Sequence, residues 1–261
     1  GPGVYMVSND RLGGSTLTLY DLTDDWTGNP TINAYSVSTP TYAMGSNAYQ
    51  LGSSDRLDIR DLRMQSAFYL NGIVHCVFHA KDPNSAYQVI NYNRITVSNQ
   101  TNQSRVFGLS GYDYTYPTFA SYATSTTDKS VMIDFLRSGS SIYPEERVVN
   151  CDDNMNWSSS TQVQAGQGPV TVCYASNINA NRWGDYTGIS RKHNSPTPSV
   201  WLTAQYGTSS NDWLTWIAEV HDNSTTGTGN ISEGKSNMKI FPNPIVDIFK
   251  IEFSSYSVLS Y

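Results

Sequence analysis

The chain has 261 residues, of which only 15% are charged, and its 16 Lys and Arg against 22 Asp and Glu give a formal net charge of −6. This acidic balance excludes a nucleic-acid binder held by phosphate contacts, and the 12% of aromatic residues excludes an intrinsically disordered chain. No run of about 18 apolar residues occurs, so we expect no membrane span. The excess of Ser, Thr, Asn, Gly and Tyr instead predicts many short strands joined by polar turns.

A repeated pattern runs along the chain, and each copy has a polar-aromatic lead-in, a short strand, a turn and a more apolar strand. Equivalent positions in the three copies are Ala67, Ala120 and Ile189, and Asn71-Gly72 forms the turn of the first copy. Each copy continues with further strands, and a partial unit precedes the first copy. In chain order, strands are expected at residues 4–8, 15–22, 63–70, 73–80, 87–92, 105–109, 116–122, 130–135, 147–151, 161–164, 185–190, 199–204 and 213–220.

Four-stranded antiparallel units repeated in sequence are typical of a β-propeller. A β-sandwich also has short strands at regular spacing, but the repeated four-strand pattern favours the propeller. Because no long period of 3.6 residues is present, few helices are expected. We therefore predict an all-β fold, a β-propeller of four-stranded antiparallel blades. The opening unit lacks its first strand and the last unit lacks a closing strand, so either the two complete each other or the chain holds part of a larger propeller.

Three segments near the end of the repeats, Arg182–Gly188, Val200–Tyr206 and Trp213–Ala218, carry a resemblance to known proteins. They resemble a pattern in many exported bacterial proteins with sialidase-like β-propellers. The resemblance covers most of residues 4–220, and it implies an exported or cell-surface β-propeller without implying a defined activity. The same pattern includes Gln50-Leu51-Gly52, Asp58, Arg63, Gln65, Tyr116-Pro117, Phe135–Gly139 and Tyr143-Pro144.

The C-terminal tail carries a second resemblance. Met238–Pro244, followed by Asp247 and the alternating apolar residues of 248–253, resembles the start of a type A C-terminal sorting domain of the type IX secretion system of Bacteroidota. This resemblance implies a secreted or cell-surface protein with the type IX secretion machinery as a partner. Such domains usually extend further than Tyr261, so we expect a truncated one. The predicted parts are a β-propeller at 3–221, a polar linker at 222–237 and the start of the sorting domain at 238–261.

The cysteines and two of the histidines do not indicate a metal or cofactor. Cys76 lies in an apolar run and is expected to be a small buried hydrophobic residue. Cys151 and Cys173 lie in separate strand-like segments, where a disulfide and two free thiols are both open alternatives. His75 and His79 share one face of a strand, but no carboxylate lies at matching spacing, so we expect hydrogen-bonded histidines and no metal or cofactor.

Polar and aromatic residues gather in the lead-ins to the first strands, which converge at one end of the channel in a propeller. Glycosidases need two carboxylates about 5–9.5 Å apart. The candidate catalytic carboxylates are Asp58, Asp61, Asp113 and Asp185. A sialidase also uses arginines that bind the substrate carboxylate and an ionised tyrosine nucleophile, for which Tyr116 is the candidate. The candidate ligand-binding residues are Arg60, Arg63, Tyr112, Tyr114, Arg182, Trp183 and Tyr186.

The same residues also suit a structural role, because Arg–Asp pairs and Tyr hydroxyls commonly tie adjacent blades together. Gly184 permits a tight turn, and Asp185 is predicted to be a buried carboxylate bonded to Arg182 or Arg63. The S-x-D-x-G-x-T-W box of sialidases is absent, and Asp152–Trp157 is only a degenerate form of it. We therefore predict a non-catalytic propeller that binds a glycan or a surface protein. The alternatives are a glycoside hydrolase or polysaccharide lyase, and a structural blade array completed by a partner chain.

Overall fold

The chain divides into two compact units, Gly1–Asp222 and Asn223–Tyr261. The computed structural model describes residues 3–23, 28–123, 125–195 and 197–221, together with the backbone of 239–241 and 250–252. These described residues form strands and contain no helix, and hence none that is long and apolar enough to span a membrane. The all-β prediction is confirmed. The part assigned to the sorting domain lies almost entirely outside the described residues.

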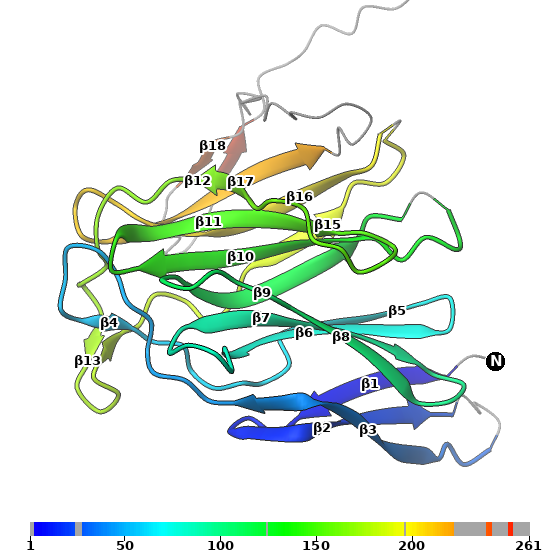
Figure 1. Cartoon of the computed structure of the whole chain (residues 1–261). Coiled ribbons are helices and arrows are strands. Elements are labelled where there is room, and N and C mark those ends of the chain that lie inside the picture. Colours follow the sequence, from blue (N-terminus) through cyan, green and yellow to red (C-terminus); the bar gives the residue numbers. More distant parts are fainter. Residues whose placement is uncertain are drawn as a thin grey trace, which may run out of the picture. The chain divides into compact units, whose positions relative to one another are not determined.

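Four larger antiparallel sheets, which we call blades 1 to 4, follow one another in chain order (Figure 1). Blade 1 pairs β1 (Val4–Asn9), β2 (Gly13–Leu22) and β3 (Ile32–Ala43) in that order. Blade 2 pairs β5 (Ser66–Leu70), β6 (Ile73–Lys81), β7 (Gln88–Thr96) and β8 (Thr101–Phe107). Blade 3 pairs β9 (Asp113–Ser121), β10 (Val131–Gly139), β11 (Ile142–Cys151) and β12 (Thr161–Gln164). Blade 4 pairs β15 (Gly188–Arg191), β16 (Ser199–Gly207) and β17 (Trp213–His221).

Two small sheets complete the described strands. The first joins β4 (Arg56–Leu57), β13 (Tyr174–Ala175) and β14 (Ala180–Asn181), and within it β4 runs parallel to β14. This parallel pair lays the lead-in of blade 2 beside the lead-in of blade 4. In the second unit, β18 (Lys239–Phe241) and β19 (Lys250–Glu252) form an antiparallel pair.

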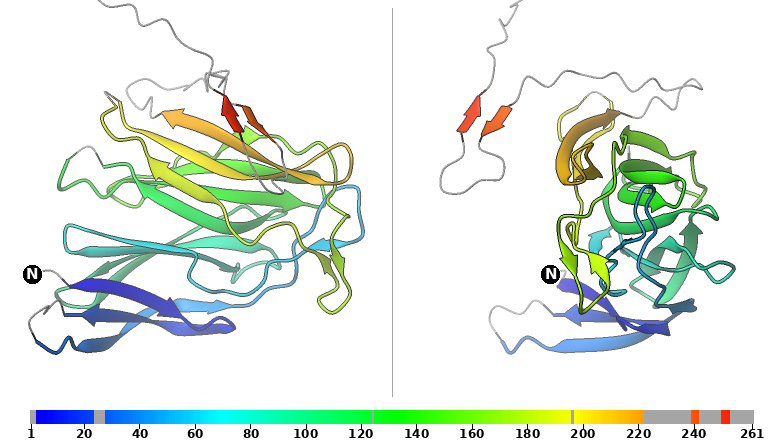
Figure 2. Two further views of the ribbon diagram at one scale, coloured as in Figure 1. Left: turned by 180° about the vertical axis from the view of Figure 1, so that it is seen from behind. Right: turned by 90° about the vertical axis from the view of Figure 1, so that its left-hand side faces the viewer.

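Each blade packs face to face on the next, so the core consists of layers between neighbouring blades (Figures 1 and 2). Strand β6 shows how the sequence achieves this. Val74, Cys76 and Phe78 pack into the cluster shared with blade 1, whereas the intervening Val77 packs with Phe119 of blade 3. Because successive side chains of a strand point to opposite faces, a strand buried on both faces reads as one continuous apolar run.

The positions of the sequence repeat are confirmed by the structure. Ala67, Ala120 and Ile189 lie in β5, β9 and β15, the first strands of blades 2, 3 and 4. The Asn71-Gly72 turn has positive φ at both residues, 47° and 81°, as the favoured two-residue hairpin turn requires. Strand β3 was not predicted, because its side chains are mostly exposed and its polar, Pro-containing sequence has no strong alternation.

Two alternatives left open by the sequence are now settled. Blades 1 and 4 lie at opposite ends of the stack in Figure 1, and in the described part of the chain no strand of one pairs with a strand of the other. They therefore do not complete each other, and each has three strands of its own. Of the two alternatives for Cys151 and Cys173, free thiols are observed: Cys151 is buried in blade 3, Cys173 is exposed before β13, and neither they nor Cys76 form a disulfide.

Candidate functional site

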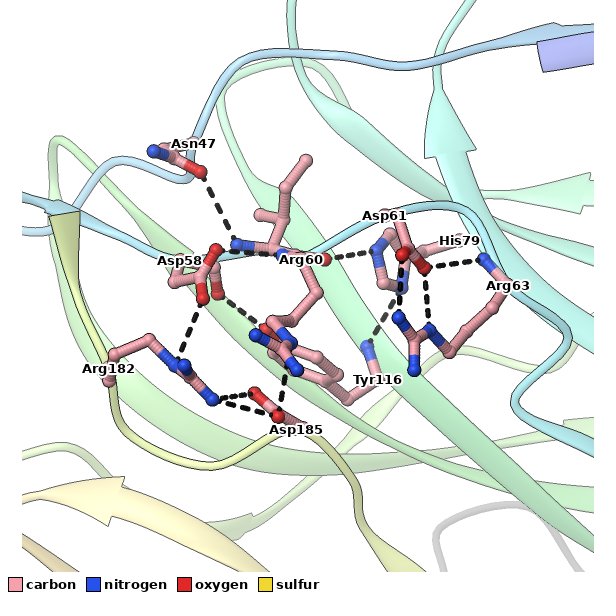
Figure 3. A network of polar contacts seen from close by, with 10 residues as sticks. Asn47, Asp58, Arg60, Asp61, Arg63, His79, Tyr116, Arg182 and Asp185 are labelled. Carbon is pink, nitrogen blue, oxygen red and sulfur yellow. Dashed lines mark hydrogen bonds and ion pairs between the residues drawn. The ribbon is translucent and has the colours of Figure 1, made fainter. Parts of the chain in front are cut away.

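The lead-ins of blades 2 and 4 meet where β4 runs beside β14. Asp58 directly follows β4, and its N–H donates to the carbonyl oxygen of Asn181 at 3.0 Å. Arg60 follows Asp58 in a left-handed backbone conformation, φ 61°, which directs its N–H to Asp58 Oδ1 at 2.9 Å. From the other lead-in come Arg182 and Asp185. These four charged residues, Asp58, Arg60, Arg182 and Asp185, form what we call the lead-in network (Figure 3).

The network is a row of alternating charges. Arg182 Nε lies 3.1 Å from Asp58 Oδ2, and its terminal nitrogen lies 2.9 Å from Asp185 Oδ2. Arg60 Nε approaches the same Asp185 oxygen at 3.1 Å. Beside it, Arg63 forms a separate two-point ion pair with Asp61 at 2.7 and 2.6 Å, which lowers the pKa of the Asp61 carboxyl. The three candidate arginines Arg60, Arg63 and Arg182 thus each already have a carboxylate partner within the protein.

Tyr116 and His79 lie beneath this network and are fully buried. The Tyr116 hydroxyl donates to the Asp58 carbonyl oxygen at 2.6 Å. The backbone N–H of Tyr116 donates to His79 Nδ1 at 3.2 Å. Because Nδ1 is an acceptor, the His79 proton lies on Nε2, which donates to the Ile59 carbonyl oxygen at 3.0 Å. Both ring nitrogens are therefore used, and burial lowers the His79 pKa to about 4.

The environment of Tyr116 does not favour an ionised nucleophile. Burial raises its pKa well above 10, and the nearby negative charges of Asp58 and Asp185 raise it further. The hydroxyl proton is also committed to a carbonyl oxygen of the protein backbone. The arrangement therefore holds β9 against the lead-in of blade 2, whereas tyrosine-based chemistry needs a depressed pKa and an open approach.

Asp113, Tyr112 and Tyr114 make their contacts elsewhere. Asp113 begins β9 and accepts hydrogen bonds from the N–H groups of Tyr49 and Gln88 at 2.8 and 2.9 Å. Burial raises its pKa to about 6. The Tyr112 ring lies beneath the Arg137 guanidinium, and Tyr114 is buried in the core shared by blades 2 and 3. The grouping of these three with the other candidates is therefore not observed.

Two further predictions need correction. Trp183 was a ligand-binding candidate but is buried in an apolar cluster with Leu57 and Tyr116. Asp185 is only half-buried, with 26% of its side chain exposed; it pairs with Arg182, one of the two predicted partners, and also with Arg60. Through Arg60, Asp185 connects the lead-in of blade 4 to that of blade 2. Gly184 is a tight turn as expected, with φ 119° and the Gln205 side chain only 3.1 Å from where a Cβ would stand.

Two groups of buried polar residues were not predicted from the sequence. Arg94 of β7 is buried and donates to the carbonyl oxygens of Lys129, Asp152 and Asp153 at 2.9, 2.7 and 2.6 Å, so that blade 2 holds two connections of blade 3. Asp134 and Glu146 are fully buried on β10 and β11. The sequence signal that could have identified these residues is a charged residue within an otherwise apolar strand.

A polar cavity of about 470 Å³ lies between β8 and the two connections that Arg94 holds. It is lined by Asn102, Gln103, Ser104, Arg105, Lys129, Asp153, Asn154 and Met155. No group of three or more His, Cys, Asp or Glu side chains in the described ranges is arranged to hold a metal ion.

Comparison with known proteins gave one structural likeness. No protein-family model matches the chain, and no curated protein matches it. Among solved structures, it is similar to the crystal structure of a subtype N11 neuraminidase-like protein of A/flat-faced bat/Peru/033/2010 (H18N11). The match has 10% identity and a TM-score of 0.30, and it covers 84% of this chain and 88% of the other. The fold therefore rests on the strand pairing and blade packing alone.

Proposed function

We propose that the first unit is a non-catalytic, glycan-binding β-propeller module of an exported protein. The observation that carries the proposal lies on blade 4, where Trp201 is 37% exposed on β16. Its neighbours Leu202 and Val200 pack toward blade 3, so Trp201 points to the outer face. Ser190 of β15 and Glu219 of β17 lie directly opposite Trp201 on either side.

An exposed indole flanked by polar groups suits a sugar. The ring offers an apolar face for stacking, while hydroxyl and carboxylate groups beside it can bond the sugar hydroxyls. Lys192 adds a donor, since its Nζ lies 2.8 Å from Glu219 Oε1 on the same side of the blade. A low content of charged residues fits a neutral polar ligand better than an ionic one.

The non-catalytic part of the proposal rests on the lead-in network. A glycoside hydrolase of the sialidase type needs arginines free to bind the substrate and a reactive tyrosine. Arg60 and Arg182 are paired with protein carboxylates, and the Tyr116 hydroxyl is buried against a carbonyl oxygen. The hydrolase or lyase alternative therefore lacks support from the residues that would perform it.

A glycan array followed by calorimetry on any bound glycan tests this proposal. We expect Trp201→Ala to abolish binding, because the stacking surface is removed. Trp216→Ala is the matched control, since Trp216 is similarly exposed on β17 but its partner Ala204 places it on the opposite face. An array without any ligand, or equal losses in both variants, would overturn the proposal.

Within the described residues, the outer side of β17 pairs with no other strand, which favours a second candidate, a blade array completed by a protein partner. Strand β17 is an edge of a three-stranded sheet and contains no Lys, Arg or Pro, the residues that usually protect such edges. Leu214 and Ile217 are exposed along it. If a strand is added there, sedimentation velocity will show association that Thr215→Lys removes; a compact monomer at all concentrations contradicts this candidate.

Export remains part of the proposal on the strength of the tail sequence. Residues 238–261 resemble a type IX sorting domain, and we propose that they direct the protein to the cell surface or the medium through that machinery. In a host with this secretion system, the chain ending at Asp222 should stay inside the cell while the full chain is exported. Equal export of both would refute the assignment.

A further inference from the structure

Asp134 of β10 and Glu146 of β11 occupy the interface between blades 3 and 4, and neither side chain is exposed to solvent. In the antiparallel register, Asp134 lies opposite Val148 and Glu146 lies opposite Leu136. The two carboxylates are therefore diagonal neighbours on one face of the blade, within reach of each other. That face packs against β16.

The surroundings of the pair offer little compensation for charge. Val148 packs with Val200 and Leu202 of β16, so the carboxylates lie beside an apolar layer. The polar groups facing them are the Phe135 N–H and the Thr187 hydroxyl, toward Asp134, and the Ala204 N–H, toward Glu146. None of the four carboxylate oxygens has a partner at hydrogen-bond geometry in the described residues.

The Thr187 hydroxyl does not donate a hydrogen bond to the Asp134 carboxylate, because it already donates its proton elsewhere. Thr187 Oγ1 donates to the Tyr116 carbonyl oxygen at 2.8 Å and lies 2.7 Å from Thr118 Oγ1. Thr118 is the residue opposite Asp134 on β9. A proton on Asp134 would instead find an acceptor close by in either Glu146 or the threonine oxygen.

Charged groups on the packed elements point elsewhere. Arg137 and Arg147, on the same strands as the pair, both bind Glu145 on the opposite face, at 2.5 and 3.2 Å. Strand β16 carries no charged residue, and β9 carries only Asp113, which accepts from two backbone N–H groups. Strand β15 carries only Arg191, at its last position. In the described part of the chain no ion pair reaches either carboxylate.

We propose that Asp134 and Glu146 hold a proton in place of a counter-ion, and that this carboxyl pair is a pH-sensitive latch between blades 3 and 4. Two adjacent negative charges in a dry interface would be strongly unfavourable, whereas one proton allows a short, charge-assisted O–H···O⁻ bond. Loss of that proton to solvent leaves two repelling carboxylates and loosens the interface. The inference does not depend on the proposed glycan binding.

Burial raises the pKa of both carboxyls, and the Glu146 charge raises that of Asp134 further. The pKa of Glu146 reaches about 8. In the unfolded chain both groups lose their protons near pH 4.5 or below. Stability is therefore fully present at low pH and is lost as the pH rises toward the folded pKa, because only the folded state still binds the proton.

Melting temperatures between pH 6.5 and 8.5 test the latch. The wild-type value should fall by about 4 °C or more over this window. The double variant Asp134→Asn/Glu146→Gln is close to isosteric and removes both titrating groups, so its melting temperature should change much less over this window. Glu219→Gln, at a carboxylate paired with Lys192 on blade 4, is the matched control and should keep the wild-type slope.

Infrared spectroscopy of the wild-type protein keeps the test decisive even if a variant fails to fold. A protonated-carboxyl band at pH 7 that disappears at alkaline pH supports the latch. Absence of that band overturns it. Calcium or magnesium ions that raise the wild-type melting temperature, with reversal by a chelator, also overturn it, since a metal ion would then compensate the pair.

Discussion

Asp58 and Asp185 share the guanidinium of Arg182 but differ in burial. The Asp58 side chain is 6% exposed and the Asp185 side chain 26% exposed, while Arg182 itself is 41% exposed. Ion pairs open to solvent contribute little to stability, because water already satisfies the charges. A nearly buried carboxylate loses more when its charge-assisted bonds are removed.

We therefore expect Asp185→Asn to reduce the free energy of unfolding by at most about 1 kcal/mol. Asp58→Asn should cost about 2–3 kcal/mol, since a buried acceptor for Arg60 N–H and Arg182 is weakened. Urea denaturation of both variants measures the difference. A larger loss for Asp185→Asn would mean that the exposed end of the network carries the stability.

The buried histidines predict a loss of stability in acid. Burial holds the pKa of His79 at about 4 and that of His75 at about 3, against 6.5 in an unfolded chain. As the pH falls below 6.5, the unfolded state takes up protons that the folded state does not. Each histidine then destabilises the fold by up to about 1.4 kcal/mol per pH unit.

Raised carboxyl pKa values act in the opposite direction over part of this range, so the comparison must be between variants. His79→Gln should show a smaller loss of stability than wild type between pH 6.5 and 4.5. His193→Gln, in an exposed turn, is the matched control. Equal slopes for wild type and His79→Gln would show that His79 is protonated in the folded state.

At the level of elements, Arg94 connects two blades through backbone groups. Its guanidinium leaves β7 and donates to three carbonyl oxygens in the β9–β10 and β11–β12 connections, and its Nε donates to Tyr92 Oη at 3.0 Å. Carbonyl oxygens spaced along two connections match the planar fork of an arginine. The single ammonium of a lysine cannot reach all of them.

We expect Arg94→Lys to cost about 3 kcal/mol of unfolding free energy, since buried acceptors lose their donors. Arg105→Lys, an exposed arginine on the adjacent β8, should change stability by less than about 0.5 kcal/mol. Chemical denaturation measures both. If Arg94→Lys is as stable as Arg105→Lys, the carbonyl oxygens are satisfied without the guanidinium.

The elements show where sequence interpretation succeeds and where it stops. Strong local signals predicted the first strands and the Asn71-Gly72 hairpin, because turn chemistry and apolar runs act over a few residues. The two-residue strands β4 and β14 have no such pattern, and their parallel pairing joins segments more than 100 residues apart. The site could be predicted as a gathering of lead-ins, but not that Asp113 lies outside it or that its arginines are already paired.

At the scale of the whole molecule, the first unit contains its own core. The four apolar clusters draw their members from residues before 222, within the compact unit Gly1–Asp222. We expect a chain ending at His221 to melt within about 2 °C of the full chain, because the described apolar clusters lie within the first unit. Calorimetry of the two chains checks this. A large drop would mean that the second unit supports the first.

The order in which the blades pack predicts that they differ in their resistance to local unfolding. Blades 2 and 3 have neighbours on both faces, whereas blade 1 packs on blade 2 and blade 4 on blade 3. A linear array of this kind frays from its ends, so amides of β6 and β10 should exchange with deuterium only through global unfolding. Amides of β3 and β17 should exchange through partial opening. The proposed glycan surface around Trp201 thus lies on a terminal blade, where a ligand would gain most by suppressing fraying.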